Sequence, residues 1–495
     1  MDLKKLQNGS DIRGIAIGAD ANLTGEAVSK IACAFTAWLC AKTDKKSPVI
    51  SIGMDSRLSG PEFRQICIRS FMESGANAID CGMASTPAMF MTTVTPGFEC
   101  DGAVMITASH LPSNRNGLKF FTKDGGLEKQ DITEILAIAE SGNFVTGSGT
   151  VQEKDFMSVY AKMLADKIRK ETGEEKPLSG FKIIVDAGNG AGGFYVDKVL
   201  NPLGADTQGS QFLEPDGSFP NHVPNPEDES AMQSITDAVI RTNADFGIIF
   251  DTDVDRAGAV DKGGSELNRN RLIAAISAIL IGEVSGSTIV TDSITSSGLA
   301  EFISSIGGRH HRFKRGYKNV INEAIRLNNE GVYTPLAIET SGHAALRENY
   351  FLDDGAYLVT RFLIQIAKLR KENKTLSDMI SSLKEPAESN EFRLKILNED
   401  FRAFGNKIIE ELTQYAQGQP SFHIASDNHE GIRVSFGSED GDGWFLLRLS
   451  LHEPLLPINI ESDRTGGAKK IAKVLYDFLK GYDDLDLKPL QSFVD

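Results

Sequence analysis

Apolar runs alternate with amphipathic stretches along most of the chain, and three segments share one pattern. Each has an apolar, β-rich run, then an aspartate, then small or glycine residues, and finally a helical pattern. The segments are Pro48–Gly60, Lys182–Gly193 and Ser287–Gly298, with the aspartates Asp55, Asp186 and Asp292. Each aspartate stands where a strand should pass into the N-terminus of a helix. Strands that alternate with helices predict βαβ units around mostly parallel sheets, here in three copies.

Each copy continues into a second apolar run that ends in a polar loop. The loops are at Ser109, Asp251–Arg256 and Glu339–His343. In open α/β sheets, ligands bind outside the carboxyl ends of the strands. We therefore expect all three loops at that edge, where three such domains side by side would direct them into one central cleft.

The pattern changes from about Leu383 onward. A helix-like stretch at 401–416 is followed by alternating strands at 431–437 and 443–451, a further run at 457–462 and a last helix at 467–480. Strands grouped beside helices indicate an α+β domain with an antiparallel sheet. The sequence thus predicts three similar α/β domains with mixed, mostly parallel sheets, at residues 1–157, 158–262 and 263–382, and an α+β domain at 383–495.

Composition narrows the classes of partner. The chain has 495 residues, and its 52 basic and 68 acidic residues give a net charge of −16. This charge argues against nucleic acid or an anionic membrane as the main partner, although a locally basic site for small anions is compatible with it. The five cysteines have an odd count and no C-x-x-C pair, which favours free thiols in a reducing compartment. The N-terminus lacks the apolar core of a signal peptide, and we expect a cytoplasmic protein.

The first candidate site is the loop at Ser109. It follows the apolar run Ala103–Ile106, which predicts a short buried strand, and it also holds His110, with Lys119 just beyond it. A serine flanked by small residues at the carboxyl end of a strand is placed to act as a nucleophile or a phosphate carrier. For an isolated Ser-His pair, a polar turn between two strands would be the commoner explanation.

The second candidate site is a run of alternating aspartates, Asp251, Asp253 and Asp255. Alternate residues of an extended loop share one side, so the three carboxylates should converge on a cation, and oxygen ligands of this kind suit Mg²⁺. An EF-hand is excluded, because its sixth position would be Arg256 and its twelfth Lys262. A phosphatase with an aspartate nucleophile remains open from this stretch alone.

Other segments carry weaker signals. Glu339 and Ser341, around a tight glycine turn, would bind adjacent sugar hydroxyls, although Ser341 is equally suited to cap a helix. The glycines at 188–193 match G-x-G-x-x-G, as in a nucleotide-dependent dehydrogenase, but that interpretation leaves the serine and aspartate loops unexplained. The cations and hydroxyls suited to anions are Arg13, Lys314, Arg315, Lys318, Arg448 and Ser450.

Taken together, these loops resemble those of the α-D-phosphohexomutase superfamily, which includes phosphoglucomutases, phosphomannomutases and phosphoglucosamine mutases. The family loops T-A-S-H-N-P, D-G-D-G-D-R, G-E-x-S-G-H and R-x-S-G-T-E-P correspond to TASHLP at 107–112, DTDVDR at 251–256, IETSGH at 338–343 and RLSLHEP at 448–454. The elements at 11–14, 53–57 and 186–192 also match. Departures from the family pattern include Leu111 for asparagine, Thr252 and Val254 for glycines, and Leu451 and His452 for glycine and threonine.

The resemblance implies an isomerase that interconverts hexose 1-phosphate and hexose 6-phosphate, with glucose or mannose as the sugar. The phosphoryl group would be carried on Ser109, and a hexose 1,6-bisphosphate would be both intermediate and activator. The implied ligands of Mg²⁺ are Ser109, Asp251, Asp253 and Asp255. The implied catalytic residues are Ser109, Lys119, Arg13 and His110. The implied substrate-binding residues are Glu339, Ser341, His343, Arg256, Lys314, Tyr317, Arg448 and Ser450.

Within that resemblance, Lys119 would handle the proton or the developing charge, with Arg13 and His343 as further candidates. His110 would support the loop or contact phosphate. Two hypotheses from other classes remain beside the mutase. One is a Mg²⁺-dependent phosphatase with Asp251 as nucleophile, and the other is a sugar-phosphate-binding protein without catalytic activity.

Overall fold

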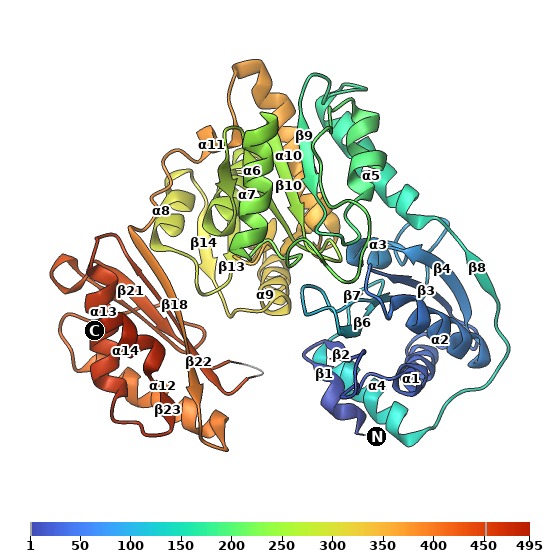
Figure 1. Cartoon of the computed structure of the whole chain (residues 1–495), viewed down its shortest axis with the longest axis horizontal. Helices are drawn as coiled ribbons and strands as arrows, with labels where there is room; N and C mark the ends of the chain where they lie inside the picture. Colours follow the sequence, from blue (N-terminus) through green and yellow to red (C-terminus); the bar gives the residue numbers. More distant parts are fainter. Residues whose placement is uncertain (1, 451–452) are drawn as a thin grey trace. The chain divides into compact units, whose positions relative to one another are not determined.

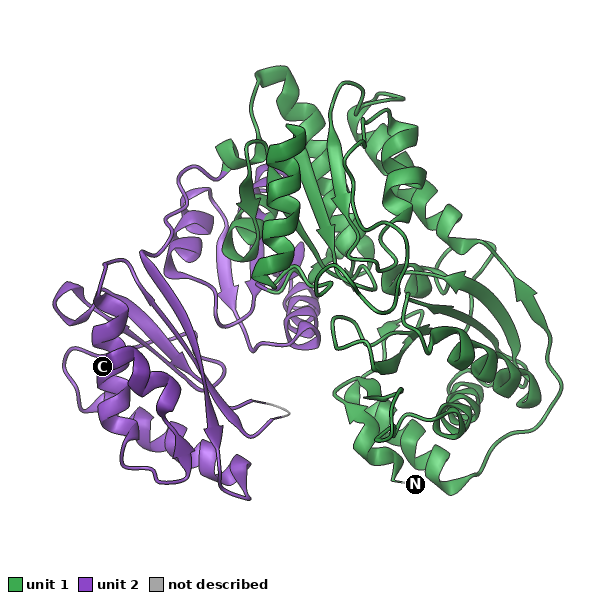
Figure 2. Cartoon of the chain, in the orientation of Figure 1, with its two compact units in different colours: residues 1–276, 341–379 green, residues 277–340, 380–495 purple. Residues whose placement is uncertain are grey.

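A computed structural model describes residues 2–450 and 453–495, which form two compact units (Figures 1 and 2). Unit 1 consists of residues 1–276 and 341–379, and unit 2 of residues 277–340 and 380–495. Leu451 and His452, two of the residues that depart from the family pattern, lie outside the described residues. In the described part of the chain, no helix has the length and apolar character needed to cross a membrane.

The first sheet of unit 1 is mixed. Its strands run in the order β1-β2-β6-β5-β3-β4-β8, and β7 pairs with β6. The strands are β1 (Gln7–Asn8), β2 (Asp11–Ile15), β3 (Val49–Met54), β4 (Asn77–Met83), β5 (Gly102–Ile106), β6 (Arg115–Thr122), β7 (Gly125–Gly126) and β8 (Val151–Glu153). The central strands β5, β3, β4 and β8 are parallel, whereas β6 runs antiparallel to β5. The predicted buried strand before Ser109 is confirmed as β5, all of whose residues are buried.

The helices in this part of the chain are the short η1 (Leu3–Leu6), α1 (Gly25–Thr43), α2 (Gly60–Glu73), α3 (Thr86–Met91), α4 (Lys129–Ser141) and α5 (Phe156–Thr172). Of these, α1, α2 and α4 bury the main apolar core against the sheet. The side chain of Thr24 caps the start of α1 by accepting from the Ala27 N–H. Phe35 of α1 packs on Phe120 of β6 with ring centroids 4.8 Å apart. Apolar residues of α1, α2 and α4 join those of β3, β5 and β6 in one cluster.

The second sheet of unit 1 has the order β12-β11-β10-β9. Its strands are β9 (Ile183–Asp186), β10 (Phe246–Phe250), β11 (Ala257–Asp261) and β12 (Ser265–Leu267), and β9 and β10 are parallel. The other elements of this part of the chain are η2 (Val196–Leu200), η3 (Asn201–Leu203), α6 (Glu229–Thr242), α7 (Arg269–Glu283), β16 (Ala344–Leu346), η4 (Arg347–Asn349), β17 (Leu352–Asp353), α10 (Gly355–Leu369), η5 (Arg370–Glu372) and α11 (Leu376–Met379).

The local pattern predicted at Lys182–Gly193 is confirmed in this sheet. β9 ends at Asp186, residues 188–193 form turns, and helical backbone follows at 194–195 and continues into η2. The glycines are needed for close packing, since a Cβ on Gly190 would lie 2.6 Å from the Thr252 carbonyl oxygen. A larger residue at Gly190 would collide with the backbone of Thr252. This close packing accounts for the glycine run, and no bound nucleotide is needed to explain it.

Unit 2 contains parallel strands and a separate antiparallel sheet. β13 (Thr288–Thr291) pairs in parallel with β14 (Arg309–Arg312) and β15 (Leu336–Ile338), and α8 (Ser297–Ser305) and α9 (Tyr317–Asn329) follow β13 and β14. The C-terminal sheet has the order β19-β20-β21-β22-β18-β23, with every pair antiparallel. Its elements are β18 (Glu388–Ile396), α12 (Phe401–Gln417), β19 (His423–Ile424), β20 (Ile432–Phe436), η6 (Ser438–Asp440), β21 (Gly443–Leu447), β22 (Leu455–Ser462), α13 (Gly467–Leu479), β23 (Leu485–Asp486) and α14 (Lys488–Val494). The predicted fold class, mixed α/β sheets followed by an α+β domain, is confirmed.

Candidate active site

Ser109 lies in the turn that follows β5. Its backbone has a φ of 53°, in the left-handed region, and its N–H donates to the Thr107 hydroxyl at 2.8 Å. The Ser109 hydroxyl donates to Asp251 Oδ2 at 3.2 Å and accepts from Arg256 Nη2 at 2.8 Å. The turn therefore directs a nearly buried hydroxyl toward residues that follow another strand, β10.

The three aspartates after β10 converge as predicted. Asp251, Asp253 and Asp255 are buried, and one carboxylate oxygen of each lies within 4.8 Å of the others. Lys119 Nζ donates to Asp253 Oδ2 at 3.1 Å and to Asp255 Oδ2 at 2.5 Å, while Arg256 Nε donates to Asp251 Oδ2 at 3.1 Å. Two cations thus lie against three buried carboxylates.

This donor set fits a divalent cation. Among the described residues, the buried oxygens Asp253 Oδ1 and Asp255 Oδ1 have no hydrogen-bond partner. An unsatisfied buried carboxylate oxygen is costly, and carboxylate oxygens are the ligands that Mg²⁺ takes in proteins. Asp251, Asp253 and Asp255 are therefore suited to hold Mg²⁺.

Burial and the neighbouring charges shift the pKa values of Asp251 and Asp255. Burial, with the neighbouring Asp255 charge, raises the pKa of Asp251 well above its ordinary value. Burial would also raise the pKa of Asp255, but the positive charges of Lys119, His343 and Arg256 outweigh burial and lower this pKa. A cation among the three carboxylates would relieve the repulsion that Asp251 experiences.

His110 is held neutral beside Ser109. Burial, together with the charges of Arg256 and Arg13, lowers the pKa of His110 to about 2. His110 Nδ1 lies 2.6 Å from Arg256 Nη2, and because a guanidinium only donates, Nδ1 is the acceptor of that bond. The same nitrogen lies 3.4 Å from Ser109 Oγ. A neutral imidazole bonded in this way is suited to orient Arg256 and the loop.

His343 has the opposite character. Its Nδ1 lies 3.4 Å from Asp353 Oδ2 and 3.9 Å from Asp255 Oδ1. Burial would lower the pKa of His343, but Asp255 and Asp353 raise it to about 9. The imidazole is therefore protonated near neutral pH, as a group that donates a proton or stabilises negative charge must be.

Two further predicted residues lie in unit 1. Arg13 of β2 stands opposite Gly117 of β6, and a Cβ on Gly117 would come within 3.1 Å of Arg13 Cγ. Arg13 Nη2 donates to Asp11 Oδ2 at 2.9 Å. Ser341 Oγ is buried, and it has no hydrogen-bond partner in the part of the chain that the structure describes.

The remaining predicted residues belong to unit 2. Glu339 Oε1 accepts from the Gly316 N–H at 2.7 Å, which links it to the turn that carries Lys314 and Tyr317. Arg448 and Ser450 follow β21, and their N–H groups donate to the carbonyl oxygens of Pro457 and Leu455. Within unit 2 the structure thus joins the glutamate to the basic turn and places Arg448 and Ser450 on the C-terminal sheet.

Sequence patterns did not identify several partners of these residues. Thr86, at the start of α3, donates from its N–H to the Asp253 carbonyl at 2.8 Å and from Oγ1 to Asp253 Oδ2 at 2.5 Å. Asn225 Oδ1 accepts from Arg256 Nη1 at 3.2 Å. A threonine or asparagine in a loop has no local signature of such contacts.

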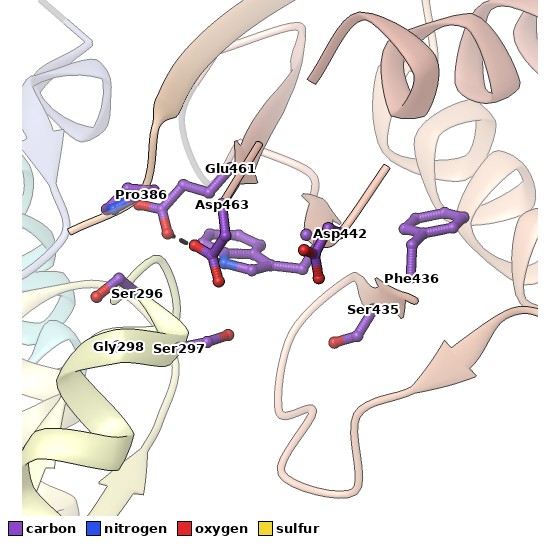
Figure 3. Close-up of a pocket in the computed structure, with 11 residues that line it drawn as sticks. Ser296, Ser297, Gly298, Pro386, Ser435, Phe436, Asp442, Glu461 and Asp463 are labelled. Carbon is purple, nitrogen blue, oxygen red and sulfur yellow. Dashed lines mark hydrogen bonds between the residues drawn. The ribbon is translucent and has the colours of Figure 1, made fainter. Parts of the chain in front are cut away.

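Unit 2 also contains a cavity of about 160 Å³, which differs from the predicted phosphate site in its acidic lining (Figure 3). Its lining includes the carboxylates of Asp442, Glu461 and Asp463, and Trp444 Nε1 donates to Glu461 Oε2 at 3.0 Å. Three acidic side chains would repel a phosphate. The sugar-phosphate chemistry expected from the sequence is therefore not assigned to this cavity.

Three stretches of the chain match protein families. Residues 4–146, 158–264 and 268–386 match the families described as phosphoglucomutase/phosphomannomutase, alpha/beta/alpha domains I, II and III, respectively.

Individual proteins are similar over nearly the whole chain. A phosphoglucomutase of Neisseria meningitidis serogroup A is 31% identical over 465 residues, across 93% of this chain and 94% of the relative. A phosphomannomutase/phosphoglucomutase of Pseudomonas aeruginosa is 29% identical over 474 residues, across 96% and 95%. The crystal structure of a phosphoglucomutase/phosphomannomutase family protein from Burkholderia thailandensis superimposes with a TM-score of 0.80 at 25% identity, across 97% of this chain and 98% of that one.

Proposed function

Because this chain belongs to the phosphoglucomutase/phosphomannomutase family of α-D-phosphohexomutases, we propose that its buried site moves a phosphoryl group between the 1- and 6-hydroxyls of a hexose phosphate. The enzyme is an isomerase of the phosphohexomutase type. The observation that carries the proposal is the position of Ser109 Oγ, between Arg256 and the first of three buried aspartates. We propose glucose and mannose phosphates as the substrates, and the cytoplasm, where the five free cysteines would stay reduced, as the location.

Ser109 is the proposed phosphoryl carrier. In the first half of the reaction, the bond between phosphorus and Ser109 Oγ breaks while a bond forms to the free hydroxyl of a hexose monophosphate. The hydroxyl gives up its proton to a protein group, and the product is a hexose 1,6-bisphosphate. After this intermediate reorients, Ser109 Oγ takes the phosphoryl group from the other end, and the oxygen that loses it is protonated.

The charges of the site support a metal-assisted transfer. Lys119, Arg256 and protonated His343 provide three positive charges against the three carboxylates. A phosphoryl group on Ser109 adds negative charge that these cations leave unbalanced. Asp251, Asp253 and Asp255, with the phosphorylated Ser109, would hold Mg²⁺. When bound, Mg²⁺ supplies neutralisation of the charge that builds up during transfer.

Three residues are candidates for handling the proton or the developing charge. Lys119 makes direct contacts with Asp253 and Asp255, and is the first candidate. His343, protonated near neutral pH, is suited to donate to the departing oxygen. Arg13 would stabilise negative charge, because a guanidinium keeps its proton throughout. His110, which is neutral and bonded to Arg256, would orient the loop.

Substrate recognition is proposed for the remaining residues. Glu339 and Ser341 would bind sugar hydroxyls by paired hydrogen bonds. Lys314, Tyr317, Arg448 and Ser450 would bind the phosphate that is not transferred, for which charge-assisted hydrogen bonds are suited. A hexose 1,6-bisphosphate is the proposed activator, since it phosphorylates Ser109 directly.

The experiment that tests this function combines intact mass with turnover. Wild type, Ser109→Ala and the control Ser113→Ala, in the same loop, are incubated with Mg²⁺ and glucose 1,6-bisphosphate. We expect a gain of one phosphoryl mass in wild type and Ser113→Ala only. The same two proteins should convert glucose 1-phosphate and mannose 1-phosphate to the 6-phosphates.

Two outcomes contradict the proposal. Release of inorganic phosphate that persists in Ser109→Ala would identify a phosphatase with Asp251 as nucleophile. Binding of hexose phosphate by a wild-type protein that is never phosphorylated and never turns over would identify a binding protein.

A further inference from the structure

A single buried guanidinium holds the backbone of the Ser109 loop. Arg57 follows β3 and is 1% exposed. Its Nη1 donates to the carbonyl oxygens of Pro112 at 2.8 Å and Arg115 at 2.9 Å. Its Nη2 donates to the carbonyl oxygens of Leu111 at 2.6 Å and of Ser109 itself. Both terminal nitrogens therefore use both of their N–H groups, all on carbonyls of one loop.

The partner of Arg57 fixes the other side of the same loop. Asp55 Oδ1 accepts from the Arg57 N–H at 2.9 Å, and Asp55 Oδ2 lies 3.4 Å from Arg57 Nε. The Asp55 N–H also donates to the Ile106 carbonyl oxygen at 3.1 Å, where β5 ends and the loop begins, and Thr107 Oγ1 accepts from the Ser109 N–H. The Asp55–Arg57 pair thus holds the start of the loop through the Asp55 backbone and the Ser109 carbonyl through Arg57.

A second segment of unit 1 closes over the pair. A Cβ on Gly217 would lie 2.4 Å from the Ser56 carbonyl oxygen and 2.5 Å from Leu58 N, so that only glycine fits there. The Phe219 ring centroid lies 5.3 Å from Arg57 Cζ, within the range of a cation–π contact. Arg57 is enclosed on all sides that the structure describes, and its side chain has little freedom to move.

We propose that Arg57 is a positioning residue that presets the Ser109 loop for phosphoryl transfer, an inference that rests on the proposed function of Ser109. The four carbonyl contacts involve backbone atoms only. They therefore tolerate the change of loop side chain at Leu111, where the family has asparagine, without loss of loop shape. Ser109 has a left-handed backbone conformation, and a loop of this kind needs fixed contacts to remain in one conformation.

Loop position bears directly on rate. In-line transfer requires the reacting atoms to be about 3–3.5 Å apart and aligned, and a displacement of about 1 Å costs about 100-fold in rate. Substrate binding by other loops would be largely unaffected. Loss of the guanidinium is therefore expected to lower kcat far more than it changes KM.

The first test is Arg57→Lys in the full chain, with Arg64→Lys as the matched control. Arg64 lies on α2, pairs with Asp80 at 3.2 Å and is not among the residues that hold the loop. A lysine keeps the charge but has three donors at one point, which cannot reach four separated carbonyls. We expect kcat for glucose 1-phosphate to fall about 100-fold and KM to change by less than about threefold in Arg57→Lys alone.

Hydrogen exchange of the loop amides is the second readout, and it does not require catalysis. The N–H groups of Ser109, Leu111 and Arg115 are hydrogen-bonded within the loop. In Arg57→Lys, amides of residues 107–117 should exchange at least about tenfold faster, with the rest of the chain unchanged. If wild type has no mutase activity, the proposed function fails, whereas this comparison still decides whether Arg57 holds the loop.

A double variant separates the loss of loop positioning from a folding defect caused by an unpaired buried charge. Asp55→Asn/Arg57→Gln removes the cation and its counter-ion together, so no unpaired charge is left buried. It should show the same loss of kcat and the same faster loop exchange. A folded Arg57→Lys or double variant whose kcat stays within about threefold of wild type, or whose loop exchange is unchanged, overturns the proposal. If neither variant folds, Arg57 is a determinant of the fold and not a positioning residue, which also overturns it.

Discussion

Charges in the buried site are balanced residue by residue. Lys119 and Arg256 are hydrogen-bonded to the carboxylates of the DTDVDR loop (residues 251–256), and His343 is protonated beside Asp255. A buried ion pair seldom stabilises a fold, because desolvation offsets the attraction between its charges. The proposed function would account for the concentration of charge here, since the carboxylates would accept a cation and the three positive groups would face the transferring phosphoryl group.

Val254 is a strained residue in this loop, and its strain leads to a prediction on stability. Its φ is 65°, although valine is β-branched and fully buried. In the left-handed region glycine is favoured over alanine by about 1 kcal/mol, whereas at ordinary positions alanine is favoured by about 0.5–1 kcal/mol. The free energy of unfolding, measured by urea titration, should therefore be larger for Val254→Gly than for Val254→Ala. Both variants should be less stable than wild type, since burying valine contributes about 1.5–3 kcal/mol.

Val260 is the matched control. It is buried in β11, an ordinary strand, and Val260→Gly should be less stable than Val260→Ala by about 1 kcal/mol. The same order of stability at both positions would show that the loop around Val254 relaxes, and that its backbone conformation is not imposed by the fold.

Elements with a clear pattern were predictable, and the contacts between elements were not. β5 and β10 are fully buried, so each is an uninterrupted apolar run in the sequence. Asp251 directly follows β10, and Ser109 lies in the turn after β5, which is why these two residues could be identified. Thr86, Asn225 and Arg57 reach the site from other loops by polar contacts across the chain, and such pairing leaves no local periodicity.

The segment after β9 leads to a prediction on pH. His222 Nε2 lies 3.0 Å from Asp186 Oδ1, and its Nδ1 lies 2.8 Å from the Val223 carbonyl oxygen. Burial would lower the pKa of His222, but Asp186 outweighs burial and raises it. A raised histidine pKa means that the folded state binds a proton more tightly than the unfolded state. The resulting stabilisation is complete below about pH 6.5 and is lost as pH rises through the raised pKa.

His222→Gln isolates this contribution. Wild type should be more stable than the variant by about 1–3 kcal/mol at about pH 5.5, with a smaller difference at about pH 9, measured by urea unfolding. The exposed His423 of β19 provides the matched control, His423→Gln. A difference that grows with pH would mean that the imidazole is neutral when paired with Asp186.

At the scale of the whole molecule, the order of domains was predictable from the sequence, but the division of the chain into two compact units was not. The three α/β copies and the C-terminal antiparallel sheet follow from the pattern of elements along the chain. The division into units falls within α7, between Thr340 and Ser341, and between Met379 and Ile380 (Figure 2). The boundaries of a compact unit depend on contacts between residues that are far apart in the sequence. The order of strands and helices does not predict such contacts.

The two tryptophans of the chain report on the two units separately, which allows a test of metal binding. Trp38 of α1 lies in unit 1, and Trp444 of β21 lies in unit 2. Both are buried, with indole N–H bonds to Glu134 and Glu461. The three aspartates that would hold Mg²⁺ all belong to unit 1. A ligand that binds only the folded state stabilises it by about 2.7 kcal/mol at 100 times its Kd.

In the Trp444→Phe variant, Trp38 fluorescence follows the thermal unfolding of unit 1. Saturating Mg²⁺ should raise the midpoint of this transition by about 5 °C. The midpoint of Trp444 fluorescence in Trp38→Phe should stay unchanged, and chelation by EDTA should reverse the shift. Adding Asp251→Asn and Asp253→Asn to the Trp444→Phe protein is the control, and it should abolish the effect. Equal shifts for both tryptophans would show that the units unfold as one cooperative body. A Trp38 midpoint that does not respond to Mg²⁺ would show that the buried carboxylates do not hold the ion.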